Sequence, residues 1–418
     1  MTLQTCVRLW MLIAAACAAS CTGAACGSGR NGAGDAANTR EVRSAAPGDV
    51  RRVTDMRGVT ITVPARIARV ATVSDGFVES VMTRLGVIKT LVSIGSASLQ
   101  DTWSYSYPAA DGRGFSIADG MGTMRALHPW LADLPCASCR GDAIGYETIA
   151  AAKPEVVVLR VGDCTIGTTP EIVTRSVDVL TATGAPVVVL RSPADYRGQG
   201  TETLRAEIEV LGRLFGNERE AAALAAELAE AEAMIRGRIP GVPEAERPRV
   251  LYLGLASGAR SSGGAAFVWG TDTTESWMIE HVLGARNAYR GAGARVLLNA
   301  EQILALDPDV IFLPTSAGYH PPRELVEASY FRELQRLRAV RERRVYALPW
   351  APMNCARRLE YPLDLLVMAK GTYPGRFKDL AVHEWALAFY QRTYRVDRSQ
   401  ALMLRRAQWL DWTADAGY

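Results

Sequence analysis

Two stretches of the chain repeat one pattern, and this repeat limits the possible folds more than any other feature. Residues 147–159 read ETIAAAKPEVVVL, and residues 301–313 read EQILALDPDVIFL. Matched positions are offset by 154 residues, from Glu147 to Glu301. In each copy a proline stops a helical segment and a continuous apolar run follows, as in a parallel strand that helices cover on both faces. The chain is therefore predicted to build the same helix-to-strand unit once in each of two lobes.

The segments around both copies also alternate between helical and extended patterns. Strands are predicted within residues 67–74, 91–96, 155–161, 185–192, 247–258 and 340–350. Repeated strand–helix units imply parallel-type sheets. With 418 residues and 49% hydrophobic content, the chain is long enough for two cores. The predicted fold is α/β, with similar lobes at residues 51–198 and 241–418 and a ligand cleft between them.

The segment between the two lobes is predicted to be a connecting helix. Residues 199–240 are rich in Ala, Leu and Glu at helical spacing. Gly216 and Asn217 are the positions at which this helix could bend. Because a helix resists bending more than a loop does, we expect the lobes to move little relative to each other.

The N-terminal residues are typical of an exported lipoprotein. Residues 1–21 carry an early Arg8, an apolar stretch and then small residues, which is the pattern of a secretory signal. Cys21 follows the small residues and is the predicted lipidated cysteine, with Cys26 as a second candidate. An ordinary cleaved signal with incidental cysteines is the alternative. Residues 22–50 are rich in Gly, Ala, Ser and Asn and are predicted to form a flexible tether.

Residues 96–146 form a long insertion in the first lobe without a clear hydrophobic period. A loop of this length inside a compact domain is usually functional or disordered. The segment is rich in aromatic residues, which disordered segments normally lack. We therefore expect an ordered insertion that faces the ligand.

Composition and motifs exclude several classes of function. The net charge is +3 with acids and bases mixed along the chain, so no basic patch for nucleic acid is indicated. No apolar run of the mature chain reaches the length of a membrane-spanning helix. No nucleophile elbow, phosphate loop or paired-carboxylate motif is present, and the chain is not predicted to be an enzyme.

Four cysteines fall in the predicted folded body, and their role stays open between three interpretations. They are Cys136, Cys139, Cys164 and Cys355. In an exported protein the default is a disulfide, which we expect among the three first-lobe cysteines and not between Cys355 and the first lobe. Thiolates near His320 would instead suit a soft metal ion. The Cys136-x-x-Cys139 motif would also fit an exported thiol redox protein.

Several motifs together resemble one family. They include DMRGVTITVPARIARV, YETIAAAKPEVVVL, NAEQILALDPDVIFL, AVRERRVYALP and PLDLLVMAKGTYPGRF, in this order between residues 51 and 377. The chain is similar to the substrate-binding proteins of ABC importers in the class with one rigid connecting helix. The resemblance implies a monomer outside the cytoplasm that passes a ferric siderophore, cobalamin or haem to a permease and its ATPase. It implies no intrinsic cofactor, because the iron or cobalt chelate is the transported ligand. In the family, acids that match Glu147 and Glu301 dock onto permease arginines.

The ligand is expected in the loops that follow the carboxyl ends of the strands. Flat rings there would suit a chelate face, and arginines would suit its carboxylates. Packing and solvated charge are the alternatives for these side chains. The candidates are Trp103, Tyr105, Tyr107, Trp269, Tyr319, Trp350, Arg260, Arg357 and Arg358.

Overall fold

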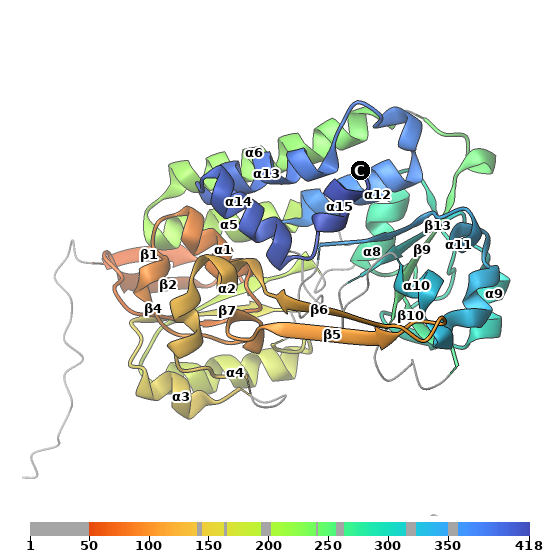
Figure 1. Cartoon of the computed structure of the whole chain (residues 1–418). Coiled ribbons are helices and arrows are strands. Elements are labelled where there is room, and N and C mark those ends of the chain that lie inside the picture. The colour runs from red at the N-terminus through yellow and green to blue at the C-terminus, as the bar shows by residue number, and fades with distance from the viewer. Residues whose placement is uncertain are drawn as a thin grey trace, which may run out of the picture. The chain divides into compact units, whose positions relative to one another are not determined.

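A computed structural model gives the fold of most of the chain (Figure 1). It describes residues 50–139, 144–162, 165–193, 202–239, 241–255, 263–314, 323–349 and 358–418. All of these residues belong to one compact unit, residues 45–418. Within these ranges, no helix combines the length and the apolar character that crossing a lipid bilayer requires.

The first lobe holds a parallel sheet with the strand order β4-β3-β7-β8. The strands are β3 (Val70–Val73), β4 (Leu91–Ser93), β7 (Val156–Val161) and β8 (Val187–Arg191). Its helices are α1 (Phe77–Arg84), η1 (Ile88–Thr90), α3 (Tyr146–Ala151), α4 (Pro170–Ala182) and α5 (Glu202–Phe215). A hairpin of β1 (Val50–Thr54) and β2 (Thr60–Pro64) precedes them. Every residue of β7 is buried, as the continuous apolar run predicts.

The second lobe is built on a mixed sheet with the order β12-β10-β9-β13-β14, with β11 beside β9. Strand β10 runs antiparallel to both of its neighbours, β9 and β12, and the other pairs are parallel, so this sheet departs from the all-parallel expectation near one edge. The strands are β9 (Arg249–Gly254), β10 (Ala266–Val268), β11 (Arg286–Asn287), β12 (Val296–Leu298), β13 (Val310–Leu313) and β14 (Val345–Ala347).

Short and long helices surround this sheet and close the chain. Those of the lobe are η5 (Glu244–Glu246), α8 (Thr274–Trp277), η6 (Met278–Val282), α9 (Ala300–Leu306), α10 (Glu324–Glu327), η7 (Ser329–Arg336), α11 (Arg338–Arg341) and α12 (Tyr361–Thr372). The closing helices are η8 (Pro374–Arg376), α13 (Val382–Tyr394), α14 (Arg398–Ala407) and α15 (Asp411–Asp415).

The repeated pattern occupies the predicted place in both lobes. Its first copy forms α3 and β7, and its second copy forms α9 and β13. Strand β7 lies between β3 and β8, and β13 lies between β9 and β14. Each copy is therefore a central helix-to-strand unit of its lobe, and the predicted two-lobed α/β fold is confirmed.

The connection between the lobes is shorter than the helix predicted for residues 199–240. The chain reverses at Gly216, whose φ of 70° suits glycine, and forms α5 and then α6 (Glu218–Gly237). Helix α5 packs on β1 and β8 and belongs to the first lobe. Of these two helices, α6 is the one that contacts both lobes. Its Glu227 accepts hydrogen bonds from Arg84 of α1 at 2.8 and 2.7 Å, and its Arg236 donates to the His281 carbonyl at 2.6 Å.

The insertion at residues 96–146 is ordered wherever it is described. It contains η2 (Ala97–Leu99), the antiparallel hairpin of β5 (Trp103–Pro108) and β6 (Gly114–Gly120), α2 (Thr123–Leu127) and η3 (Pro129–Asp133). In Figure 1 the hairpin runs from β4 and α2 of the first lobe to β10 and α10 of the second. The alternation Trp-Ser-Tyr-Ser-Tyr at residues 103–107 is the period-two signal that the sequence interpretation missed.

Candidate ligand-binding site

An ion pair between the lobes marks the candidate site. Asp75 follows β3 of the first lobe, and Arg358 precedes α12 of the second. Arg358 Nη2 lies 3.0 Å from Asp75 Oδ2, and the Asp75 side chain is fully buried. Asp75 Oδ1 also accepts hydrogen bonds from the hydroxyls of Ser96, at 3.0 Å, and of Ser98. The loops after β3 and β4 therefore meet the second lobe at the carboxyl ends of the first-lobe strands, where ligands bind in sheets of this kind.

The charge on Arg358 is held by its surroundings. Burial alone would lower the pKa of Arg358, but Asp75 and Glu360 keep the pKa above its ordinary value. Glu360 is itself buried and accepts a hydrogen bond from the Tyr394 hydroxyl. A small cavity borders Arg358 and Glu360. Its volume of about 10 Å³ is large enough for about one water molecule. The site thus presents a permanent cation that a buried carboxylate holds in place.

The described aromatic candidates differ in what their rings contact. Trp103, at the start of β5, is 38% exposed. Tyr105 is partly buried, and its hydroxyl donates to Glu324 at 3.0 Å. Tyr107 is only 2% exposed. Its hydroxyl donates to Glu327 at 3.1 Å, and burial and Glu327 raise the pKa of Tyr107.

Trp269 is also a packed residue. It is 4% exposed, and its ring meets the ring of Tyr252 edge-on at 5.1 Å. Tyr107 and Trp269 are therefore packing residues, the alternative that the sequence left open, because neither ring has a face available to a ligand.

The other predicted ligand-binding and metal-binding residues lie outside the described residues. They are Tyr319, Trp350, Arg260, Arg357, Cys164, Cys355 and His320, together with the predicted lipidation site Cys21. Arg358 is the predicted arginine that the structure places, and it lies in the interlobe ion pair.

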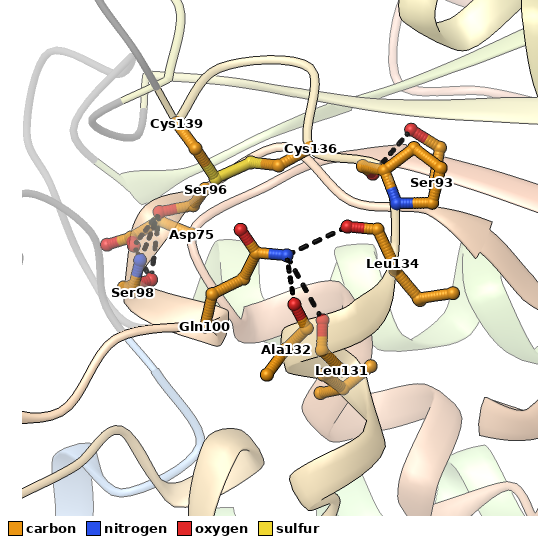
Figure 2. The surroundings of a disulfide bond; sticks show 11 residues. Asp75, Ser93, Ser96, Ser98, Gln100, Leu131, Ala132, Leu134, Cys136 and Cys139 are labelled. Carbon is orange, nitrogen blue, oxygen red and sulfur yellow. Dashed lines mark hydrogen bonds between the residues drawn. A yellow bond between two sulfur atoms is a disulfide. The ribbon is translucent and has the colours of Figure 1, made fainter.

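Cys136 and Cys139 form a disulfide, in agreement with the bond expected among the first-lobe cysteines (Figure 2). Cys136 pairs with Ile94 in a parallel bridge that extends the edge of β4. Figure 2 shows the disulfide beside the group of Asp75, Ser96 and Ser98. Bonded sulfurs are not thiolates, so the predicted metal-ligand role does not describe this pair in its oxidised form. No group of three or more His, Cys, Asp or Glu side chains suited to a metal ion occurs in the described ranges.

His128 of the insertion is partly buried. Its Nε2 is 2.9 Å from the Thr83 hydroxyl. Burial and the nearby charge of Lys89 lower the pKa of His128 to about 4. The ring is therefore neutral at pH 7.

Sequence interpretation missed Asp75, Ser96 and Ser98. All three follow predicted strands directly, in the segments VATVSDGF and LVSIGSAS. A carboxylate at the carboxyl end of a buried strand was the available signal.

The two glutamates of the repeat occupy matching exposed positions. Glu147 lies in the first turn of α3, and Glu301 lies in the first turn of α9. Both are exposed, and among the described residues neither has an ion-pair partner. Both acids are therefore accessible, one on each lobe.

Comparison with known proteins identifies the family. Residues 128–352 match the family model described as periplasmic binding protein, which is more than half of the chain. The chain belongs to the periplasmic binding protein family. This membership agrees with the resemblance found in the sequence: a substrate-binding component of an ABC transporter outside the cytoplasm. No curated protein sequence matches this binding protein.

Solved structures of periplasmic binding proteins share its fold. A periplasmic solute binding protein from Veillonella parvula has a TM-score of 0.64 at 20% identity, covering 88% of this chain and 100% of its own. The molybdate periplasmic binding protein of a Haemophilus influenzae ABC transporter has a TM-score of 0.60 at 17% identity, and the match covers 83% of this chain and 98% of its own. A periplasmic heme binding protein from Pseudomonas aeruginosa has a TM-score of 0.51 at 19% identity, and the match covers 74% of this chain and 93% of its own. At these identities the similarity shows the fold.

Proposed function

We propose that this periplasmic binding protein captures an anionic metal chelate, an iron siderophore, cobalamin or a haem-like compound, and delivers it to an ABC permease. The observation that carries the proposal is the guanidinium of Arg358, held charged by Asp75 at the carboxyl ends of the first-lobe strands. Arginine binds carboxylates and oxyanions through paired hydrogen bonds. Two neighbours with this fold are named for molybdate and heme, which both carry negative charge.

The exposed ring of Trp103 supports a ligand with a flat face. Trp103 pairs with Gly120 across the hairpin. Two residues later, a Cβ added to Gly122 would lie 3.9 Å from Arg358 Nη1. An exposed indole and a charged guanidinium are thus brought to one region, and this combination suits the ring and the acidic groups of a chelate.

Delivery to the permease is assigned to Glu147 and Glu301. Each lobe presents one of these exposed acids at the start of its repeated helix. Paired acids of this kind would meet arginines of a membrane partner from both lobes at once. Lipidation at Cys21 would keep the protein at the membrane that holds this partner, and a Cys21→Ser variant should leave the membrane fraction.

The experiment that tests the proposal identifies the bound compound. The protein is purified from its native host, and its absorption spectrum and metal content are measured. Haem, cyanocobalamin and a ferric catecholate are then titrated into the ligand-free protein while tryptophan fluorescence is followed. We expect iron or cobalt in the native sample and quenching by one of the three probes. Zinc or copper without any chelate would overturn the proposal and favour a thiolate site that uses Cys164, Cys355 and His320.

A further inference from the structure

The β5–β6 hairpin is fixed at its base in the first lobe. Gln100 precedes the hairpin, and its Nε2 donates to the carbonyl oxygens of Leu131, Ala132 and Leu134 at 3.3, 3.0 and 2.8 Å (Figure 2). Arg125 of α2, which follows the hairpin, donates from Nε to the Gln100 carbonyl at 2.8 Å. These contacts tie the two ends of the hairpin to each other, and the 2.9 Å contact between the Thr83 hydroxyl of α1 and His128 Nε2 joins this base to the first lobe.

The far end of the hairpin is part of the second lobe. Tyr107 is 2% exposed and belongs to the hydrophobic core that contains Leu251 and Phe331. Its hydroxyl donates to the Glu327 carboxylate at 3.1 Å, and the Ala110 N–H donates to the Glu327 carbonyl at 2.8 Å. A first-lobe side chain thus completes the core of the second lobe, and separating the two would expose a buried aromatic ring.

The C-terminal segment also holds the hairpin, at the end of β6. Trp409 Nε1 donates to the Ala118 carbonyl at 2.8 Å, and the Met121 N–H donates to the Ala407 carbonyl at 3.0 Å. A Cβ added to Gly120 would come within 2.6 Å of the Trp409 ring. Glycine is needed there because the backbone and the indole are in direct contact.

These attachments make the hairpin a second connection between the lobes, in addition to α6. We propose that the β5–β6 hairpin is a brace that holds the lobes at a fixed separation, so that ligand enters and leaves without closure of one lobe onto the other. The six residues of β5 span about 20 Å as an extended strand. An extended backbone cannot lengthen further, and a connection through α6 alone would still allow rotation about that helix. This inference goes beyond ligand capture, because it concerns the motion of the lobes and not the identity of the ligand.

The test makes the brace slack without removing its docking contacts. The slack variant carries Gly-Ser-Gly-Ser inserted after Asp101 and again after Gly120, together with Trp409→Ala, which removes the contact of the Trp409 ring with the end of β6. The matched control carries Trp409→Ala and both inserts in the exposed turn at Asp111 and Gly112, beyond the docked residues. Small-angle scattering of the ligand-free proteins should give a larger radius of gyration for the slack variant than for the control. Identical scattering of the two folded variants would overturn the proposal.

Hydrogen exchange on the unmodified protein decides the matter independently of whether the slack variant folds. A docked brace predicts that the amides of β5 and β6 exchange about as slowly as those of β13 in the second-lobe core. Exchange of the hairpin at the rate of an exposed loop would show that it is not attached in solution, and the brace would be refuted.

Discussion

Glu155 and Asp309 occupy equivalent positions in the two lobes, and each binds the backbone at the start of the neighbouring strand. Glu155 Oε2 accepts hydrogen bonds from the N–H groups of Ala68 and Arg69 at 2.6 and 3.2 Å, and Asp309 Oδ2 accepts one from Arg249 N–H at 2.7 Å. In return, both acids donate their own N–H to the carbonyl of the respective arginine at 2.8 Å. The acid after the proline thus has the same role in both copies of the repeat, because it ties the central strand to its neighbour.

The ion pair of Arg160 in β7 and Glu207 in α5 gives the first prediction. Both side chains are fully buried, and the guanidinium donates from Nε and Nη2 at 2.7 and 2.9 Å. Glu207→Gln should lower the free energy of unfolding by about 3–5 kcal/mol, because it leaves a buried charge without its counter-charge. Urea unfolding at pH 7 measures this loss.

The control for this prediction lies on the same helix. Glu209 pairs with Arg205 at the surface, and Glu209→Gln should cost no more than about 1 kcal/mol. The double variant Arg160→Met with Glu207→Leu should recover much of the loss, since an apolar pair can replace a buried ion pair. Equal effects of Glu207→Gln and Glu209→Gln would contradict the prediction.

His128 is expected to make the stability of the protein depend on pH. Its pKa in the folded protein is lowered to about 4, whereas an unfolded histidine titrates near the ordinary value of about 6.5. As the pH falls below 6.5, His128 becomes protonated in the unfolded state, whereas in the folded state it stays neutral until about pH 4. The contribution to stability is therefore complete above pH 6.5 and is lost between pH 6.5 and 4.

The measurement for His128 is thermal or urea unfolding between pH 7 and 4. His128→Gln keeps a polar partner for the Thr83 hydroxyl and should show a smaller loss of stability over this range. His281→Gln, a change at an exposed histidine, should leave the pH dependence as in the unmodified protein. If His128→Gln lost stability as steeply as the unmodified chain, another group would have to be responsible.

The parts of the fold that depend on neighbouring residues could be predicted from the sequence, and the parts that depend on distant ones could not. Helix-to-strand units carry their own signals of proline and apolar runs. The break between α5 and α6 was predicted as a bend, because Ala and Leu at helical spacing continue on both sides of Gly216 and do not distinguish a bend from a reversal. The candidate site was the hardest part, since Asp75 and Arg358 are separated by 283 positions.

The insertion illustrates the same limit. Order in the described part of the insertion could be predicted from the aromatic content, but the contacts of Tyr107 could not, because its partner Glu327 lies 220 positions away. Nothing local distinguishes an aromatic ring that faces a ligand from one that is buried in another lobe. Trp103 and Tyr107 belong to the same alternating segment, yet Trp103 is 38% exposed and Tyr107 is 2% exposed.

The disulfide of Cys136 and Cys139 is expected to stabilise the insertion modestly. The loop it closes is very short, with a sequence separation of 3. The chain-entropy relation gives about 2 kcal/mol for such a loop. Cys136→Ser with Cys139→Ser should lower the free energy of unfolding by about that amount. Mass mapping of the unreduced protein should find these two cysteines bonded and Cys355 outside any bond to the first lobe. A bond from Cys355 to a first-lobe cysteine would contradict the expectation.

Transport should depend on Glu147 and Glu301 together. One exposed acid at the start of the repeated helix in each lobe can meet a two-sided membrane partner, and neither acid has an ion-pair partner among the described residues. Glu147→Ala with Glu301→Ala should abolish uptake in cells, while the affinity of the purified protein for its chelate stays unchanged. Each single variant should retain part of the uptake, because one acid would still contact the permease.

The control for the docking acids is a double change at two other helix starts. Glu171 and Glu218 are exposed acids in the first turns of α4 and α6, so Glu171→Ala with Glu218→Ala removes the same charge from the same kind of position. An acid near a helix N-terminus is worth only about 0.3–1 kcal/mol of stability. Both double variants should therefore fold, and only the first should stop uptake. Normal uptake with the Glu147 and Glu301 double variant would leave these acids with no more than that helix-stabilising role.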